Sequence, residues 1–446
     1  MSSTKLKFPN YLNISLFLIT FLLSLQINFD PPIWKAYGDP YDYLHQSKMP
    51  LSDKNFYFPE KTENFYPRPF TVPLFYKMVK SKPDLIIKLQ KFFHYLGAFV
   101  LCAVLLLYLK KTYVKLIFVL FWYLFMSWWN ITGWANTLLS ESLSISLMFI
   151  WLASFLYYHK KRKLILLFLH IFVTILFSFT RDSWPYILLT FYTLYILSAI
   201  KWDKKMLIPY SIFLIMSIII FFTQQHSANI GQRYRLPILN NIVFKILPNN
   251  NYISWFKEEG MPCADDLKKE YSNLNNYKEI YPLYNDTNYT ELFNWVIKDG
   301  KTVYMKFLLT HPYKSFLFTE KSSDLKKIFA HNFGYIGPIS GLAKLSHFIF
   351  PLFNIIFVLI LFIIFIYLSG KEKSRLWLFP SIIIIVFTVN ALILYNADAL
   401  EVERHLFITN IMIQFMGIYL ITHILDSKNF SRYTKIFGLW IKSRTS

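Results

Sequence analysis

Long apolar runs alternate with short polar turns over most of the chain, and two long polar segments interrupt the series. A helix needs about 20 predominantly apolar residues to cross the hydrocarbon core of a bilayer. The pattern therefore predicts an all-α polytopic membrane protein with about ten transmembrane helices. The expected spans are 11–29, 90–109, 114–131, 139–158, 164–180, 185–200, 206–223, 346–369, 376–395 and 405–425.

The two polar segments divide the chain into three parts. We expect an N-terminal transmembrane module at 1–223 with a first outer loop at 30–89, an outer-face region at 224–345, and C-terminal transmembrane helices with a cytosolic tail at 346–446. The outer-face region is predicted to be mostly helical, because apolar residues between 290 and 310 recur at spacings that place them along one helix face. Those residues are Phe293, Val296, Val303, Phe307 and Leu308.

Composition supports the membrane interpretation. Hydrophobic residues make up 55% of the 446 residues and charged ones 16%, whereas soluble domains carry about 25% charged residues. The net charge of +21 is accounted for by topology, without nucleic acid as a partner. The two cysteines, Cys102 and Cys263, form neither a disulfide framework nor a metal-binding pattern. Basic residues before the first apolar run look like a signal peptide, but no small-residue cleavage site follows, so we expect an uncleaved first span.

The basic residues in short connections predict the orientation of the chain. They cluster at 5–7, 110–111, 160–163, 201–205 and 371–375 and in the C-terminal tail, and all these places fall on one side, which the positive-inside rule assigns to the cytosol. Both termini are then cytosolic, and both long segments face outward. Of the 26 acidic residues, only Asp203, Glu372 and Asp426 fall on the cytosolic side. Two polar loops explain most of this bias, but acids on short outer turns also suggest a working outer face.

The first outer loop carries two candidate functional groups, an acidic pair and an arginine. Asp39 and Asp42 lie in "GDPYDYL", where a carboxylate can serve as a general base toward a hydroxyl. The alternative is an interfacial loop within an aromatic belt. Arg68 lies between two prolines that stiffen the loop. Its guanidinium suits bidentate phosphate binding, and the alternative is a side chain that reaches the lipid headgroups.

Three further places carry charge at outer span ends. Glu141 lies one turn inside a span, where an ionisable side chain is costly and usually faces the bundle interior. Arg181 and Asp182 form an outer turn, which is also an ordinary place for an exposed charged pair. The turn before the last span has the charges to bind a cation or a phosphate. The alternative is an ordinary solvated turn. Its charged residues are Asp398, Glu401, Glu403 and Arg404.

Taken in order, these motifs resemble those of the GT-C superfamily of integral membrane glycosyltransferases. The similarity is to bacterial members akin to dolichyl-phosphate-mannose–protein mannosyltransferases and aminoarabinose transferases. "GDPYDYL" is similar to a first-loop Asp motif, with Asp39 as the acid and Tyr43 following. "RPFTVPLFY", "SES" around Glu141, His311-Pro312 and Glu403-Arg404 resemble later motifs. The chain departs from the family pattern in that two residues separate its first-loop acids, where mannosyltransferases carry an adjacent pair.

The resemblance implies transfer of a sugar from a polyprenyl-phosphate-linked donor to an acceptor hydroxyl, with inversion at the anomeric carbon. It implies Asp39 as the base that deprotonates or orients that hydroxyl. The implied roles are catalysis by Asp39, Asp42 and Glu141, binding of the donor phosphate by Arg68, Arg181 and Arg404, and substrate binding by Tyr43, Asp182, Glu401 and Glu403. The partners are then the lipid-linked donor, a lipid-, glycan- or protein-linked acceptor, and membrane lipids. The place implied is the plasma membrane of a bacterium.

Two other functions stay open at this point. No phosphate-binding glycine loop or histidine cluster with metal spacing is present, so no cofactor is required, although a divalent metal remains possible. A flippase or transporter for a lipid-linked glycan predicts charged residues near the bilayer midplane. The span centres are apolar apart from His170, Asn390 and few others, which favours an enzyme. An O-antigen-type polymerase or ligase usually has its dominant outer loop late in the chain, and the early loop here argues against it.

Overall fold

The computed structural model is built from α-helices, short 3₁₀ and π turns, and loops. It describes residues 39–62, 65–272, 274, 277–311, 349, 355–371, 378–399 and 402–428. Within these ranges no strand forms, and the single bridge pair joins Thr62 to Phe65. The all-α fold class predicted from the sequence is confirmed.

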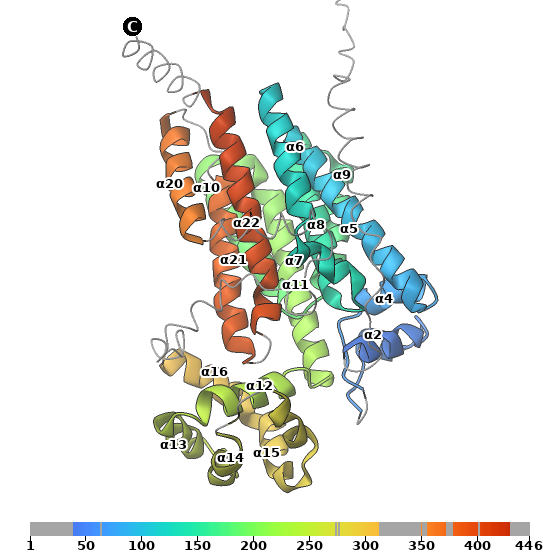
Figure 1. Ribbon diagram of the computed structural model, residues 1–446, viewed down its shortest axis with the longest axis vertical. Helices are drawn as coiled ribbons and strands as arrows, with labels where there is room; N and C mark the ends of the chain where they lie inside the picture. Colours follow the sequence, from blue (N-terminus) through green and yellow to red (C-terminus); the bar gives the residue numbers. More distant parts are fainter. Residues whose placement is uncertain are drawn as a thin grey trace, which may run out of the picture.

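Most of the long helices run roughly side by side along the long axis of the molecule (Figure 1). Short helical turns, α7 (Trp129–Thr132), η1 (Gly133–Asn136) and η2 (Lys204–Met206), connect some of them. The long helices are α5 (Pro83–Leu106), α6 (Thr112–Met126), α8 (Ser140–Lys161), α9 (Leu164–Ser178), α10 (Trp184–Trp202), α11 (Leu207–Ile230), α20 (Ile355–Lys371), α21 (Leu378–Ala397) and α22 (Val402–Asp426).

Five helical stretches in the described part of the chain are long and apolar enough to cross a membrane. They are Pro83–Leu106, Ser140–Lys161, Lys204–Ile230, Leu378–Ala397 and Arg404–Asp426. The chain therefore has the helices of a membrane-embedded protein. Helices α6, α9 and α20 are apolar but shorter, α10 covers the span expected at 185–200, and the span expected at 11–29 lies outside the described residues. The full number of ten spans stays a prediction.

Two helices extend beyond their predicted ends. Helix α5 begins at Pro83, so the first loop ends before residue 89, where the polarity pattern placed its end. Its first turns carry exposed Asp84 and Lys88 but bury Ile86 and Ile87, and proline is well suited to the first position of a helix. Helix α11 likewise continues to Ile230. A hydropathy pattern marks the apolar part of a helix, whereas a helix can continue into water.

The centre of the bundle is formed by α8, which is buried on nearly all sides. Helix α5 packs closely against it, because a Cβ atom on Gly97 would lie 2.6 Å from the carbonyl oxygen of Ser146. Helix α22 is also mostly buried, whereas α11 exposes large apolar side chains such as Ile219 and Phe222. This is the distribution expected when inner helices contact protein and outer ones contact lipid.

Short helices gather at one end of the bundle, the lower end in Figure 1. The first loop contributes α2 (Asp39–Lys48), α3 (Lys54–Tyr57) and α4 (Thr71–Met78). The helices after α11 form a unit with an apolar core of its own, which includes Leu239, Phe256 and Phe307. We call it the 235–310 unit. Its elements are α12 (Arg235–Asn241), η3 (Ile242–Ile246), α13 (Asn250–Glu258), α14 (Ala264–Tyr271), η4 (Tyr277–Asn285), η5 (Thr287–Tyr289), α15 (Thr290–Trp295), η6 (Val296–Gly300) and α16 (Lys301–Thr310).

The 235–310 unit forms hydrogen bonds with the chain where α21 ends. The Asn241 amide donates to the carbonyl of Ala397 at 2.9 Å, and the Tyr304 hydroxyl donates to that of Asn396 at 2.8 Å. The Lys245 ammonium donates to the carbonyl of Tyr395. These three bonds satisfy the carbonyls at the C-terminal end of α21, which have no partner inside the helix. They also fix the unit next to the turn that leads into α22.

Candidate functional site

Three arginines and three carboxylates meet at the end of the bundle that carries the short helices. We call Asp39, Asp42, Glu141, Arg68, Arg181 and Arg404 the arginine–carboxylate cluster. They come from the start of α2, the loop before α4, the first turn of α8, the α9–α10 turn and the start of α22. Every member makes an ion pair with at least one other member. Residues nominated singly from the sequence are thus brought together in space.

Arg68 connects the two first-loop acids. Its Nη2 lies 2.5 Å from Oδ1 of Asp39 and 2.8 Å from Oδ2 of Asp42. The side chain of Gln46 accepts from the Arg68 backbone N–H at 3.0 Å and donates to its carbonyl at 2.9 Å. The guanidinium also lies over the ring of Tyr43, 5.6 Å from its centroid. Arg68 is therefore held at both its backbone and its side chain.

Arg404 connects the first loop to the membrane bundle. Its Nη2 donates to Oδ2 of Asp39 at 2.7 Å, and its Nε donates to Oε1 of Glu141 at 2.7 Å. The Glu141 side chain is completely buried. A buried carboxylate is stable only when it is paired and hydrogen-bonded, and here the guanidinium supplies both. The cost of placing Glu141 inside a span is offset by this contact.

Arg181 completes the cluster on the side of Glu141. Its Nη1 lies 3.4 Å from Oε1 of Glu141, and its Nη2 donates to Nδ1 of His405 at 3.2 Å. The guanidinium also lies 5.5 Å from the centroid of the Phe407 ring. His405 continues the chain of contacts, because its Nε2 lies 3.7 Å from Oδ2 of Asp398.

The charges of the first-loop residues perturb one another. Burial raises the pKa of Asp39, but attraction to Arg68 and Arg404 outweighs it and holds that pKa well below its usual range. For Asp42 the balance is reversed, and burial raises its pKa despite the pairing with Arg68. Burial lowers the pKa of Arg68, and the neighbouring negative charges, Asp39 first, raise it further than burial lowers it. With Arg68 and Arg404 in place, Asp39 is an ionised and weakly basic carboxylate.

The remaining nominated residues are placed differently. Tyr43 is buried beneath Arg68. In the described part of the chain, Asp182 makes its hydrogen bonds outside the cluster: it pairs with Arg233, whose Nε and Nη2 donate to its two oxygens at 3.0 and 2.9 Å, and it accepts from Gln224 at 2.8 Å. Glu401 lies outside the described residues. Glu403 belongs to α22, and its side chain lies outside the described part.

Sequence reasoning missed two residues that hold the cluster. Gln46 fixes the Arg68 backbone, and its only sequence signal is its position one turn after Asp42 on the same helix. His405 follows Arg404 directly in the chain, so the charged turn before the last span contained a visible candidate.

The fit of the site to a divalent metal is poor. Asp39, Asp42 and Glu141 each have an oxygen directed at a guanidinium group. In the ranges that the structure describes, no three His, Cys, Asp or Glu side chains gather in a way that could hold a metal ion. A metal requires several oxygen ligands that converge on one point, and this arrangement directs them at arginines. The carboxylates of the cluster therefore serve as partners of the arginines.

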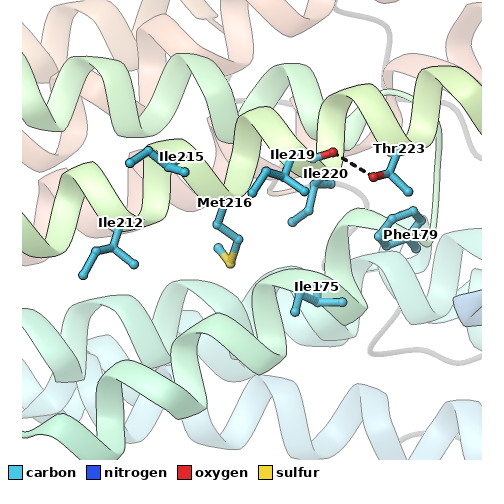
Figure 2. A pocket seen from close by; sticks show the side chains of 8 residues that line it. All are labelled: Ile175, Phe179, Ile212, Ile215, Met216, Ile219, Ile220 and Thr223. Atoms are coloured by element: carbon cyan, nitrogen blue, oxygen red, sulfur yellow. Dashed lines mark hydrogen bonds between the residues drawn. The ribbon is translucent and has the colours of Figure 1, made fainter.

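An apolar groove lies beside the cluster, between α9 and α11 (Figure 2). It encloses about 460 Å³. Its lining residues are Ile175, Phe179, Ile212, Ile215, Met216, Ile219, Ile220 and Thr223. Phe179 and Thr223 lie together at one end in Figure 2.

That end of the groove leads toward the charged residues. Phe179 precedes Arg181 by two residues, and its ring centroid lies 4.7 Å from that of Phe70, which follows Arg68 by two residues. Thr223 adjoins Gln224, which donates to Asp182. The groove therefore runs along α9 and α11 and ends at the α9–α10 turn, which carries Arg181.

Comparison with known proteins adds no relative to this geometry. A scan against protein-family models gives no match, and a search of curated proteins gives none either. The site's own chemistry therefore carries the functional argument.

Proposed function

We propose that this protein is a membrane glycosyltransferase that moves a sugar from a polyprenyl-phosphate-linked donor to an acceptor hydroxyl, with inversion, at the outer face of a membrane. The observation that carries the proposal is the arginine–carboxylate cluster at one end of an apolar helical bundle. The GT-C-like motifs of the sequence supply four of its six residues, Asp39, Arg68, Glu141 and Arg404.

The three arginines suit the leaving group of this reaction. When the bond between the anomeric carbon and the phosphate oxygen breaks, the polyprenyl phosphate gains negative charge. Guanidinium groups fixed in advance near that oxygen stabilise the developing charge. Within the cluster, three carboxylates balance three positive side chains, which avoids the cost of burying unpaired arginines.

Donor binding then exchanges partners within the cluster. As the phosphate takes up Arg68 and Arg404, the charge that holds the pKa of Asp39 down is shared with the new anion. Asp39 becomes a better proton acceptor, as a general base requires. The acceptor oxygen forms its bond to the anomeric carbon while the phosphate oxygen leaves, and the acceptor proton passes to Asp39. Polyprenyl phosphate and a glycosylated acceptor are the products.

The apolar groove supports a donor with a hydrocarbon tail. Its lining is almost entirely aliphatic and aromatic, so a hydrocarbon chain packs against it in place of lipid tails and no polar group is buried. Because the groove ends at Phe179, next to the turn that carries Arg181, we expect a chain lying in it to present its phosphate on the side of the arginines. A free sugar phosphate has no hydrocarbon chain that could occupy this groove.

The transporter alternative has less support. It calls for polar groups available at mid-membrane depth. His170, which the sequence singled out, donates or accepts at both ring nitrogens, with Ser154 at 2.7 Å and Tyr192 at 2.7 Å. These bonds join α8, α9 and α10 and have the character of a structural polar contact. A polymerase or ligase acting on lipid-linked glycans shares the cluster chemistry and differs in the size of the donor.

Transfer of a labelled sugar tests the proposal. Purified protein in liposomes is given a radiolabelled polyprenyl-phosphate hexose or pentose together with cell-envelope extract as acceptor. The proposal expects label to move to the acceptor fraction with stoichiometric release of polyprenyl phosphate. Label that crosses the bilayer still attached to its lipid identifies a flippase and contradicts the proposal.

A further inference from the structure

His405 occupies a position that none of the roles above explains. It lies in the first turn of α22, beside Arg404 and two residues before Phe407. Its two ring nitrogens face two different residues, with Arg181 at Nδ1 and Asp398 at Nε2. It therefore links a cluster arginine to the turn that follows α21.

The arginine fixes the protonation of the imidazole. A guanidinium has only donor groups, so Nδ1 of His405 must accept the hydrogen bond from Arg181. A neutral imidazole then carries its proton on Nε2. That N–H points toward Oδ2 of Asp398, 3.7 Å away. A carboxylate opposite one ring nitrogen strengthens the other nitrogen as an acceptor.

Asp398 is held in turn by the 235–310 unit. The amide of Asn240 donates to Oδ1 of Asp398 at 2.9 Å, and the Tyr284 hydroxyl donates to Oδ1 of Asn240 at 2.5 Å. The same unit binds the carbonyls of Asn396 and Ala397. The backbone and one carboxylate oxygen of the α21–α22 turn are thus set by α12, η4 and α16, and the other oxygen of Asp398 faces His405.

Within the described ranges, one terminal nitrogen of Arg181 makes an ion pair but no hydrogen bond. In the described part of the chain, its Nη1 is buried and has no hydrogen-bond partner, although it lies 3.4 Å from Oε1 of Glu141. Nη2 is engaged by His405, and the guanidinium face lies over Phe407. The side chain is 13% exposed. His405 and Phe407 therefore hold Arg181 while a buried donor group remains directed into the cluster.

We propose that His405 is a positioning residue that aims Arg181 at the donor phosphate, with its own orientation set by Asp398 and, through Asn240, by the 235–310 unit. The inference rests on the proposed function, and it adds to it a residue that acts only through Arg181. It also links the 235–310 unit to the reaction. A shift of that unit would move Asp398, then His405, and through His405 the guanidinium of Arg181. The sequence motifs contain no role for His405 or Asn240, and they offer Asp398 only as part of a charged turn.

A double-mutant cycle tests the dependence on Arg181. His405→Phe should lower kcat/KM for sugar transfer by up to about a hundredfold, the loss that a small misplacement of a catalytic group causes. In an Arg181→Ala background the same change should cost less than about twofold, because its effect passes through the missing arginine. His405→Asn, which keeps an acceptor near the Nδ1 position, should recover most of the loss. Equal losses in both backgrounds, with wild-type transfer intact, would overturn this inference alone.

Two further measurements keep the test decisive if one variant folds poorly or transfer is absent. Binding of a short isoprenyl phosphate, followed by isothermal titration, should weaken in Asp398→Ala and stay unchanged when Arg181→Ala is already present. Nitrogen-15 NMR of the histidine-labelled protein, with His405 assigned by the His405→Asn variant, should show the Nε2–H tautomer. An Nδ1–H tautomer would overturn the inference whatever the protein transfers, and wild-type protein that neither binds nor transfers would overturn the proposed function as well.

Discussion

Arg404 and Asp39 lie 365 positions apart in the chain, and the Nη2 of Arg404 donates to Oδ2 of Asp39 at 2.7 Å. The same guanidinium reaches Glu141 through Nε. One side chain at the start of α22 thus joins the first loop to the central helix of the bundle. Any ligand that draws Arg404 away from these carboxylates changes both contacts together.

The first prediction concerns the stability of the Arg404 contact. Arg404→Met should lower the free energy of unfolding by about 3–5 kcal/mol, because it leaves the fully buried Glu141 with only long contacts to Arg181 and Ser140, at 3.4 Å each. Adding Glu141→Gln to that variant should recover much of the loss. Arg162→Met is the matched control; its 2.6 Å pair with Asp203 is solvent-exposed and should contribute less than about 1 kcal/mol. Unfolding in mixed micelles measures all three, and equal losses for Arg404→Met and Arg162→Met would contradict the account.

The second prediction is a pH dependence with opposite signs for the two first-loop acids. The pKa of Asp39 is lowered in the folded protein, so its carboxylate stabilises the fold above the ordinary value of about 3.9. That stabilisation is lost as the pH falls toward the folded pKa. Asp39→Asn should therefore lower the melting temperature at pH 7, and its difference from wild type should shrink below about pH 4.

Asp42 should behave in the opposite way. Its pKa is raised, so its charged form costs stability above the folded pKa, and acidification relieves the cost. Asp42→Asn should leave the melting temperature at pH 7 unchanged or higher. Thermal unfolding of both variants over a pH series checks the pair, and curves of the same sign for both would refute the assigned electrostatics.

The third prediction separates Asp182 from the cluster. Its bidentate pairing with Arg233, whose side chain is 6% exposed, connects the α9–α10 turn to the segment before the 235–310 unit. A double-mutant cycle of Asp182→Ala and Arg233→Ala should give a coupling energy of about 1–3 kcal/mol in unfolding. Asp182→Asn should keep the KM for the donor within about twofold of wild type, since the hydrogen bonds of this residue in the described ranges go to Arg233 and Gln224. A large rise in KM at unchanged stability would restore Asp182 to a substrate-binding role.

The fourth prediction addresses the apolar groove. Ile219→Trp should partly fill the groove between α9 and α11 and weaken binding of a long polyprenyl phosphate by about tenfold, because steric displacement of a packed chain costs about 1.4 kcal/mol. A short isoprenyl phosphate should bind as before. Ile208→Trp, on the same helix at a 74% exposed position that does not line the groove, is the control. Equal loss for short and long chains would place the lipid tail elsewhere.

Much of this arrangement could be predicted from the sequence because topology restricts where charge can lie. The basic turns assign one side of the bundle to the cytosol, so Asp39, Glu141, Arg181 and Arg404 are expected at the other end. The cost of burying Glu141 predicts that it faces protein rather than lipid. These arguments predict which charged residues lie at the same end of the bundle, and the residues of the cluster are among them.

The pairings within the layer could not be predicted in this way. Arg181 and Asp182 are neighbours in one turn, yet the first contacts Glu141 and the second contacts Arg233. Adjacent side chains in a turn point in different directions, and their partners are set by tertiary packing. Nothing in the periodicity around Arg233 indicates which acid it meets. The start of α5 was misplaced for a related reason, because hydropathy reports apolar surface rather than helical hydrogen bonds.

We propose that the arginine–carboxylate cluster catalyses sugar transfer from a lipid phosphate, with Asp39 as the base. The decisive experiment is transfer from a radiolabelled polyprenyl-phosphate sugar by Asp39→Asn protein, beside wild type and the variant Asp203→Asn at the opposite end of the bundle, at matched expression and monodispersity. The account predicts a loss of at least about a hundredfold for Asp39→Asn, at the lower end of what a general base contributes, and wild-type rates for Asp203→Asn. Full transfer by the Asp39→Asn protein would contradict it.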